Sequence, residues 1–245
     1  MKNYCLTVQY DGSRYKGWAK QKNLENTIQG KLENIMSKLF NKNVEVLGSG
    51  RTDAGVHAKG QVCNFHVDSD LSAQEVMDYA NTYLPEDIAV VDAKEASERF
   101  HARYNVGSKK YVYTIDNASK PNVFQRKYTW NIPGKLNLKA MRNAASNLVG
   151  TFDFTSFTDL TKTNKSTIKT IEKIEIEKKG DFIFISVKGD GFLYHMVRII
   201  VGTLVEVGKG ERTPESIIAT LKEKSRREAG ALAPAKGLCL EKVYY

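Results

Sequence analysis

The sequence predicts an α+β protein built from two halves, residues 1–105 and 106–245. Segments with the two-residue period of strands alternate with segments that have the helical period of 3.6. The hydrophobic share of 41% is enough to bury a core and argues against disorder. A chain of 245 residues fits one large domain or two small ones. No linker rich in proline and glycine separates the halves, so we expect them to pack closely.

The first half alternates in the order strand, helix, strand, strand, helix, strand. The expected strands cover 4–10, 44–47, 62–67 and 88–91, and the expected helices cover 28–39 and 73–84. This order is typical of a ferredoxin-like unit. The first helix is indicated by apolar residues at helical spacing, namely Ile28, Leu32, Ile35, Met36 and Leu39.

Capping residues delimit both of these helices. Asn26 with Gln29 forms a plausible capping box before the first helix, and Ser72 with Glu75 forms another before the second. We expect the second helix to end at Pro85 and to place one set of side chains on a common face. That set consists of Val76, Met77, Ala80, Tyr83 and Leu84.

The second half repeats the mixture of strands and helices. We expect strands at 110–116, 168–178, 182–188 and 238–244, a further strand within 123–131, and helices at 138–149, at 194–207 and after Pro214. The strands at 168–178 and 182–188 form a hairpin through Lys179-Gly180-Asp181. The sequence therefore predicts a second ferredoxin-like half, with mixed or antiparallel sheets.

The charge balance suggests a polyanionic partner. Lys and Arg exceed Asp and Glu by nine (37 − 28), and nucleic acid is the commonest partner of so basic a chain. A generically basic surface is an equal alternative. The three widely spaced cysteines, Cys5, Cys63 and Cys239, indicate reduced thiols in a cytosolic protein. Because there is neither a signal-like start nor an apolar run of about 18 residues, we expect a cytoplasmic protein without a membrane anchor.

The segment GSGRTDAGVHAKG, residues 48–60, is the first candidate for chemistry. Its glycines permit positive φ angles and the close approach of another backbone or a ligand. Asp53 could cap a turn, pair with a cation, or act as a carboxylate nucleophile or base. From this loop alone the turn cap is favoured, because aspartate is common in glycine turns.

Arg198 is the second candidate, because it interrupts an apolar segment at 191–208. Apolar residues occur in nearly every direction around this helix, which predicts that the helix is largely buried. An unpaired charge there would cost several kcal/mol, so Arg198 needs an anionic partner, either protein or phosphate. The alternative is that the stripe bearing Arg198 faces water.

Tyr111 and Tyr113 share one face of a strand next to Lys109 and Lys110. Such a pair usually packs in or on the sheet, but beside lysines it can also stack on bases. A metal site is not expected. Cys63 and His66 have a ligand-like interval, but positions three apart on a strand point to opposite faces.

The stretch GRTDAGVHA at 50–58 resembles the central motif of the TruA-type tRNA pseudouridine synthases, and further motifs follow the family order along the whole chain. These are YDGSRYKGW at 10–18, Thr27-Ile28-Gln29, Phe100-His101-Ala102-Arg103, Tyr111-x-Tyr113, Phe154-Thr155-Ser156-Phe157, FLYHMVR at 192–198, the glycine-containing run at 201–210, and Pro234-Ala235-x-Gly237-Leu238. The resemblance implies a pseudouridine synthase fold, in which two ferredoxin-like (RRM-like) halves join around a central catalytic cleft.

The resemblance also implies roles for individual residues. Asp53 would be the nucleophile on a flipped-out uridine, Arg198 would pair with it and keep it ionised, and Tyr111 would stack on the base and help remove the C5 proton. Arg51 would help to displace the uridine or hold its place in the stem. No cofactor or metal is implied, since the reaction is an isomerisation without redox change.

The implied substrate is the tRNA anticodon arm, with uridines at positions 38, 39 and 40, and the implied assembly is a homodimer. The candidates for phosphate contacts are Arg14, Lys16, Lys20, Lys22, Arg103, Lys109 and Lys110, with Lys162, Lys165, Arg226 and Arg227 as further ones. For any one of them taken alone, a solvated surface residue is the favoured alternative.

The chain departs from the family pattern at Ala19-Lys20 and at Thr151-Phe152. A paralogue that modifies other uridines therefore stays open, as does an RNA-binding protein without catalysis. A glycosidase-like hydrolase is less consistent, because such enzymes usually need a second carboxylate and the motifs supply none near Asp53.

Overall fold

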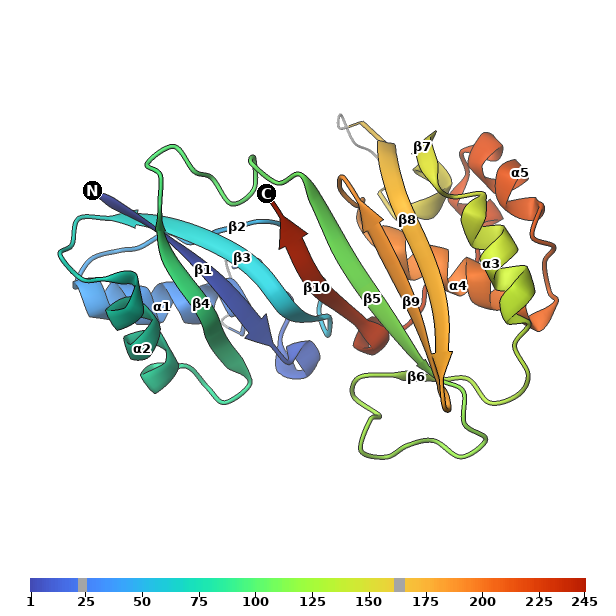
Figure 1. Cartoon of the computed structure of the whole chain (residues 1–245), viewed down its shortest axis with the longest axis horizontal. Helices are drawn as coiled ribbons and strands as arrows, with labels where there is room; N and C mark the ends of the chain where they lie inside the picture. Colours follow the sequence, from blue (N-terminus) through green and yellow to red (C-terminus); the bar gives the residue numbers. More distant parts are fainter. Residues whose placement is uncertain (22–25, 161–165) are drawn as a thin grey trace. The chain divides into compact units, whose positions relative to one another are not determined.

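The computed structural model describes residues 1–21, 26–160 and 166–245, and its fold is a mixture of helices and strands (Figure 1). The backbone contacts divide the chain into two compact units. Unit 1 comprises Met1–Gly107 with Cys239–Tyr245, and unit 2 comprises Ser108–Leu238. The last residues thus belong to unit 1, whereas the sequence had placed them in the second half. No helix in the described ranges is long and apolar enough to cross a membrane.

Unit 1 contains β1 (Lys2–Tyr10), α1 (Ile28–Phe40), β2 (Leu47–Gly48), β3 (His57–Val67), α2 (Ala73–Tyr83) and β4 (Ile88–Ala96), with the short 3₁₀ helix η1 (Gly12–Arg14) after β1. The strands β4, β1, β3 and β2 are neighbours in that order, and every pair is antiparallel. The C-terminal strand β10 (Leu238–Tyr244) pairs with β3 in parallel through Cys239 and Leu240.

The helices of unit 1 follow their apolar spacing and their caps. Ile28, Leu32 and Met36 are fully buried along α1. The predicted Asn26–Gln29 capping box is wrong, because Thr27 is the N-cap and its side chain accepts a hydrogen bond from the Gly30 N–H. On α2 the predicted capping box of Ser72 and Glu75 is confirmed.

Some expected faces and bounds in unit 1 differ from the structure. Tyr83 was expected on the apolar face of α2 but is 61% exposed. The strand expected at 44–47 begins only at Leu47, although Val44 and Val46 are buried. The strand expected at 62–67 begins at His57, so the last residues of the glycine-rich segment are part of β3.

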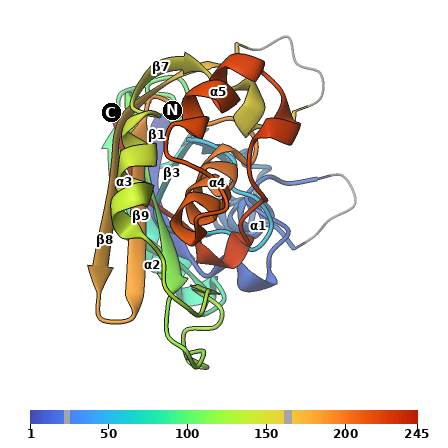
Figure 2. The same ribbon diagram turned by 90° about the vertical axis from the view of Figure 1, so that its right-hand side faces the viewer.

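Unit 2 contains β5 (Ser108–Asp116), β6 (Trp130–Asn131), α3 (Leu138–Ser146), β7 (Gly150–Asp153), β8 (Ile168–Lys179), β9 (Phe182–Gly189), α4 (Met196–Lys209) and α5 (Ser216–Glu223). Its strands lie in the order β5, β9, β8, β7 with antiparallel pairing, and β6 pairs with β5 in parallel. Figure 2 shows α3, α4 and α5 gathered beside these strands. The predicted hairpin is confirmed, with Gly180 at a φ of 59° in its turn.

In unit 2, one expected strand is shorter than predicted and one observed strand was not predicted. The strand expected within 123–131 is limited to Trp130–Asn131, because the residues before it form turns closed by hydrogen bonds such as Gln125 N–H to the Asn122 carbonyl. β7 was not expected at all.

Candidate active site

The segment of residues 48–60, termed the Asp53 loop, lies wholly within unit 1. It leaves β2 and ends inside β3. Thr52 is buried, Asp53 is half-buried and Arg51 is exposed. The Asp53 carbonyl accepts a hydrogen bond from the Val56 N–H at 3.1 Å, which closes a tight turn in which Gly55 has a φ of 78°. The loop therefore has a defined backbone that holds Asp53 close to the surface.

The segment of residues 10–18, the first motif, supports the Asp53 loop through backbone and side-chain bonds. The Trp18 N–H donates to the Thr52 carbonyl at 3.1 Å, and the Gly55 N–H donates to the Tyr15 carbonyl at 3.3 Å. The Tyr10 and Thr52 hydroxyls form a buried hydrogen bond of 2.8 Å. These contacts fix the position of Thr52, the residue directly before Asp53.

Two glycines of the first motif allow this close approach. A Cβ atom on Gly12 would lie 2.0 Å from the Val56 carbonyl oxygen, and one on Gly17 would lie 2.6 Å from the Thr52 carbonyl oxygen. Gly17 also has a φ of 95°, which side chains rarely adopt. Glycine is thus required where the two motifs meet.

His57 joins the same contact from the start of β3. Its ring is buried, and Nδ1 accepts a hydrogen bond from the Gly12 N–H at 3.0 Å. The Asp11 carboxylate lies 3.2 Å from the same Nδ1. His57 therefore has a structural contact within unit 1 that connects η1 to the Asp53 loop.

The Phe100–Arg103 motif is fixed by the middle of β3 and by the C-terminus. The Ala102 N–H donates to Asn64 Oδ1 at 2.8 Å, and the Asn64 amide donates to Asn3 Oδ1 at 2.9 Å. The Tyr245 hydroxyl donates to the Ala102 carbonyl at 2.7 Å. Arg103 follows this buried anchor and is itself exposed.

In unit 2, the two tyrosines of β5 differ in environment. Tyr113 is fully buried, and its hydroxyl donates to the Pro234 carbonyl at 2.8 Å. Burial raises the pKa of this phenol well above its ordinary value, which Arg198 partly offsets. Tyr111 is 8% exposed and meets the Phe192 ring edge-on, with centroids 5.3 Å apart. Tyr113 is thus a core residue, whereas Tyr111 adjoins the FLYHMVR motif.

Arg198 lies in the first turns of α4 and is half-buried. Its Nε donates to the Ala233 carbonyl at 2.8 Å, and the Ala233 N–H donates to the Arg198 carbonyl at 3.3 Å. A neutral carbonyl therefore holds one side of the guanidinium. Because Asp53 belongs to unit 1 and Arg198 to unit 2, their pairing stays a prediction.

Asp159 was not singled out from the sequence, although a residue of the FLYHMVR motif and one of the basic candidates both contact it. His195 Nδ1 lies 2.5 Å from Asp159 Oδ2, and Arg226 Nε donates to Asp159 Oδ1 at 2.8 Å. Although burial opposes it, hydrogen bonds from His195 and Arg226 hold the pKa of Asp159 below its ordinary value. The sequence offered one sign of this role, because Asp159 is an acidic residue two positions after the Phe154–Phe157 motif.

The basic candidates fall into groups with different environments. Arg51, Lys16 and Arg103 are exposed in unit 1, and Lys109 and Lys110 are half-buried on β5. Arg14 donates to Asp87 from Nε and a terminal nitrogen at 2.9 and 2.7 Å, and Lys20 contacts Glu33 at 2.9 Å. Lys22, Lys162 and Lys165 lie outside the described residues.

Within the described ranges, no group of three or more His, Cys, Asp or Glu side chains is arranged to hold a metal ion. Cys5 and Cys63 are buried, unpaired thiols, and burial raises the pKa of both. Cys239 is also unpaired, and burial raises its pKa to about 12. These thiols are therefore poor nucleophiles at neutral pH.

Comparison with known proteins identifies the family. The family model described as tRNA pseudouridine synthase matches residues 6–105 and 144–245. The chain is 46% identical to a tRNA pseudouridine synthase A 2 of Bacillus cereus (strain ZK / E33L), 47% to a tRNA pseudouridine synthase A of Bacillus sp. (strain KSM-64), and 49% to a tRNA pseudouridine synthase A 1 of Clostridium tetani. Each comparison covers 100% of both chains. The chain therefore belongs to the tRNA pseudouridine synthase family.

Proposed function

We propose that this tRNA pseudouridine synthase, an isomerase, converts uridine to pseudouridine at positions 38, 39 and 40 of the tRNA anticodon arm. The observation that carries the proposal is similarity over the full length to tRNA pseudouridine synthases A of several bacteria. The Asp53 loop supports it, because two motifs meet there and hold a half-buried carboxylate near the surface.

In the proposed reaction, Asp53 acts as the nucleophile on a uridine that has been flipped out of the arm. Its carboxylate attacks either C1′ of the ribose or C6 of the ring, and the N1–C1′ bond breaks. The uracil then turns and forms a C5–C1′ bond, and the bond to Asp53 is released. The C5 proton leaves and N1, freed from the ribose, takes up a proton. Atoms and electrons balance without a redox partner, so no cofactor is needed.

The remaining site residues assist this sequence. Tyr111, braced edge-on by Phe192, stacks on the target base and helps remove the C5 proton. Arg198 orients the Asp53 carboxylate, and its own Nε is anchored on the Ala233 carbonyl. Arg51, exposed two residues before Asp53, helps to displace the uridine or hold its place in the stem.

The exposed cations give the tRNA a place to bind. Lys16, Arg51 and Arg103 contact phosphates directly in this proposal. Arg14 and Lys20 already contact carboxylates, so phosphate must share or displace those partners. Lys109 and Lys110 approach the RNA beside Tyr111. Lys22 belongs to the same set from its sequence alone.

We also infer that each unit is ferredoxin-like and that the enzyme works as a homodimer. The strand order β4-β1-β3-β2 with antiparallel neighbours supports the first inference for unit 1. The family resemblance supports the second. Sedimentation equilibrium should give about twice the 27.5 kDa chain mass, and a value equal to the chain mass at working concentrations would refute the dimer.

The target uridines are tested by mapping pseudouridine with carbodiimide and reverse transcription in cells that lack this gene. We expect the marks at positions 38–40 to disappear and to return with the wild-type gene but not with an Asp53→Ala gene. Loss of marks elsewhere, with those at 38–40 retained, would refute the proposed target. That outcome would favour a paralogue, which is worth testing because Thr151 and Phe152, on β7, depart from the family pattern.

A further inference from the structure

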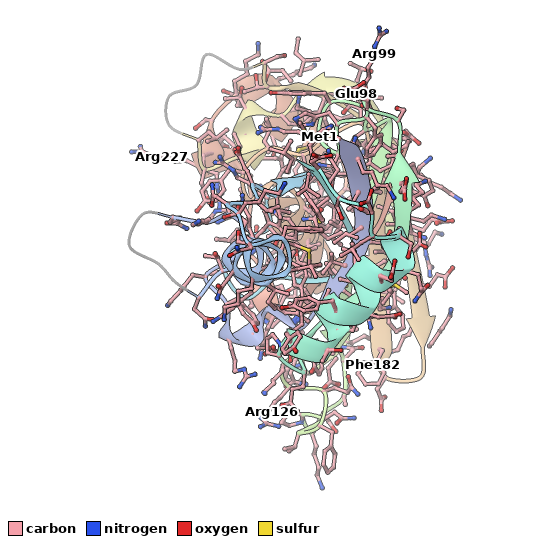
Figure 3. All side chains as sticks on the ribbon, turned by 90° about the vertical axis from the view of Figure 1, so that its left-hand side faces the viewer. Met1, Glu98, Arg99, Arg126, Phe182 and Arg227 are labelled. Atoms are coloured by element: carbon pink, nitrogen blue, oxygen red, sulfur yellow. The ribbon has the colours of Figure 1, made fainter. Side chains whose placement is uncertain are left out.

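A groove outside the Asp53 loop lies between the two helices of unit 1. It has a volume of about 680 Å³ and is bordered by α1, α2 and the end of η1. Figure 3 shows α1 in blue and α2 in teal with their side chains as sticks. The residues that matter here are Arg14, Lys31, Lys38, Tyr79 and Tyr83, which all line this space. We call it the α1–α2 groove.

One wall of the α1–α2 groove presents aromatic rings to solvent. Tyr79 and Tyr83 lie one turn apart on α2, with ring centroids 4.6 Å apart and planes inclined by 49°. Tyr83 is 61% exposed, although its spacing in the sequence predicted burial. An exposed tyrosine backed by a second ring offers a flat surface on which a base or ribose can stack.

The other wall carries positive charge. Lys31 and Lys38 lie seven residues, or about 10 Å, apart along α1, and they face the same groove. In the part of the chain that the structure describes, neither lysine has a carboxylate partner. No Asp or Glu is among the described residues that line the groove. Arg14 adds a third cation at one end, held by Asp87 at 2.7 Å.

The groove shares one residue, Tyr15, with the support of the Asp53 loop. The Tyr15 side chain lines the groove, while the Tyr15 carbonyl accepts the hydrogen bond from the Gly55 N–H. The groove and the Asp53 loop therefore both belong to unit 1 and meet at Tyr15. Cations along one wall and stacked rings along the other match the phosphates and bases of a nucleic acid strand.

We propose that the α1–α2 groove is a second RNA-binding site, which holds sugar-phosphate backbone of the bound tRNA on Lys31 and Lys38 and stacks a base or ribose on Tyr83. This proposal rests on tRNA being the substrate. It assigns to these residues a part in affinity and none in the chemical step.

The test measures binding of unmodified tRNA transcript by filter retention over a range of salt concentrations, with Asp53→Ala as the parent so that turnover does not interfere. Adding Lys31→Ala and Lys38→Ala should weaken binding about tenfold at low salt. It should also reduce the slope of log K against log salt by about 1.5, because two phosphate contacts are lost. The matched control removes two exposed lysines of unit 1 outside the groove, Lys42→Ala and Lys94→Ala, and should leave both quantities unchanged.

Tyr83 is tested separately, because stacking needs the ring and not the hydroxyl. Tyr83→Ala should weaken binding about tenfold, whereas Tyr83→Phe should bind like the parent. Ultraviolet cross-linking with 4-thiouridine tRNA should label the peptide that contains Tyr79 and Tyr83. Unchanged affinity and slope in the lysine variant, or cross-links confined to other segments, would overturn the proposal. Because binding is read without turnover, a chain that binds tRNA through the groove but makes no pseudouridine would refute only the proposed function.

Discussion

A Cβ atom placed on Gly12 would lie 2.0 Å from the backbone carbonyl oxygen of Val56. The first motif and the Asp53 loop therefore meet backbone to backbone, and a side chain at Gly12 must push the loop away. We expect Gly12→Ala to lower kcat/KM on tRNA at least about 100-fold, since a displacement near 1 Å can cost this much. Steady-state assays with a circular dichroism check of folding would measure it.

Gly107→Ala is the matched control for this change. A Cβ atom there would lie 3.6 Å from the Tyr244 carbonyl oxygen, which is an ordinary contact. This variant should keep wild-type turnover. Equal activity of the Gly12 and Gly107 variants would show that the contact between the two motifs does not position Asp53.

The buried hydrogen bond between Tyr10 and Thr52 should contribute to stability. Thr52→Val keeps the shape but removes this hydrogen bond, at a cost of about 1–3 kcal/mol. Thermal unfolding should then begin several degrees lower, at about 2–4 °C per kcal/mol. Tyr10→Phe should cost less in the Thr52→Val background than in the wild type, because the bond that the two hydroxyls share is already lost there. A double variant as unstable as the sum of both single variants would contradict this account.

The contribution of Arg198 to turnover should depend on the shape of its guanidinium group as well as on its charge. Arg198→Lys keeps the charge but loses the Nε donor that holds the group on Ala233. We expect kcat to fall at least about tenfold, while the Kd for tRNA stays within about twofold, because positioning is lost and charge is retained. Full activity in the lysine variant would mean that the anchor on Ala233 has no part in orienting Asp53.

Because Asp159 contacts His195 and Arg226, the stability of the fold of unit 2 should fall in acid. The pKa of Asp159 is held below its ordinary value of 3.8, so the ionised form stabilises the folded chain. Above pH 3.8 the folded chain has the whole of this stabilisation. It loses the stabilisation as the pH falls from 3.8 to the lower pKa that Asp159 has in the folded chain. Melting temperatures of wild type and Asp159→Asn should therefore differ at neutral pH and converge in acid. A difference that grows as the pH falls would contradict the assigned sign.

Elements with strong local signals could be predicted from the sequence. Apolar spacing identified α1 and α4, the Ser72–Glu75 pair marked the start of α2, and Gly180 marked the β8–β9 turn. The pairing of β10 with β3 could not be predicted, because it joins segments far apart in the chain and leaves no local pattern. The exposure of Tyr83 was missed because helical spacing alone does not distinguish a core face from a groove.

The candidate site was predictable in part. Asp53 could be identified as a candidate from the Asp53 loop, and the family resemblance gave it a role. Its support by the first motif depends on where two backbones meet, which neither segment reveals alone. The carbonyl of Ala233 as a partner of Arg198 was equally hidden, because backbone groups carry no sequence signal.

The central claim is that Asp53 is the nucleophile, and the most direct measurement is tritium release from tRNA labelled at C5 of uridine. Each conversion to pseudouridine frees one C5 proton, so release counts turnovers. The account predicts that Asp53→Asn binds tRNA with a Kd within about twofold of wild type but releases no tritium, since the isosteric amide cannot act as nucleophile. Release near the wild-type rate by Asp53→Asn would contradict it.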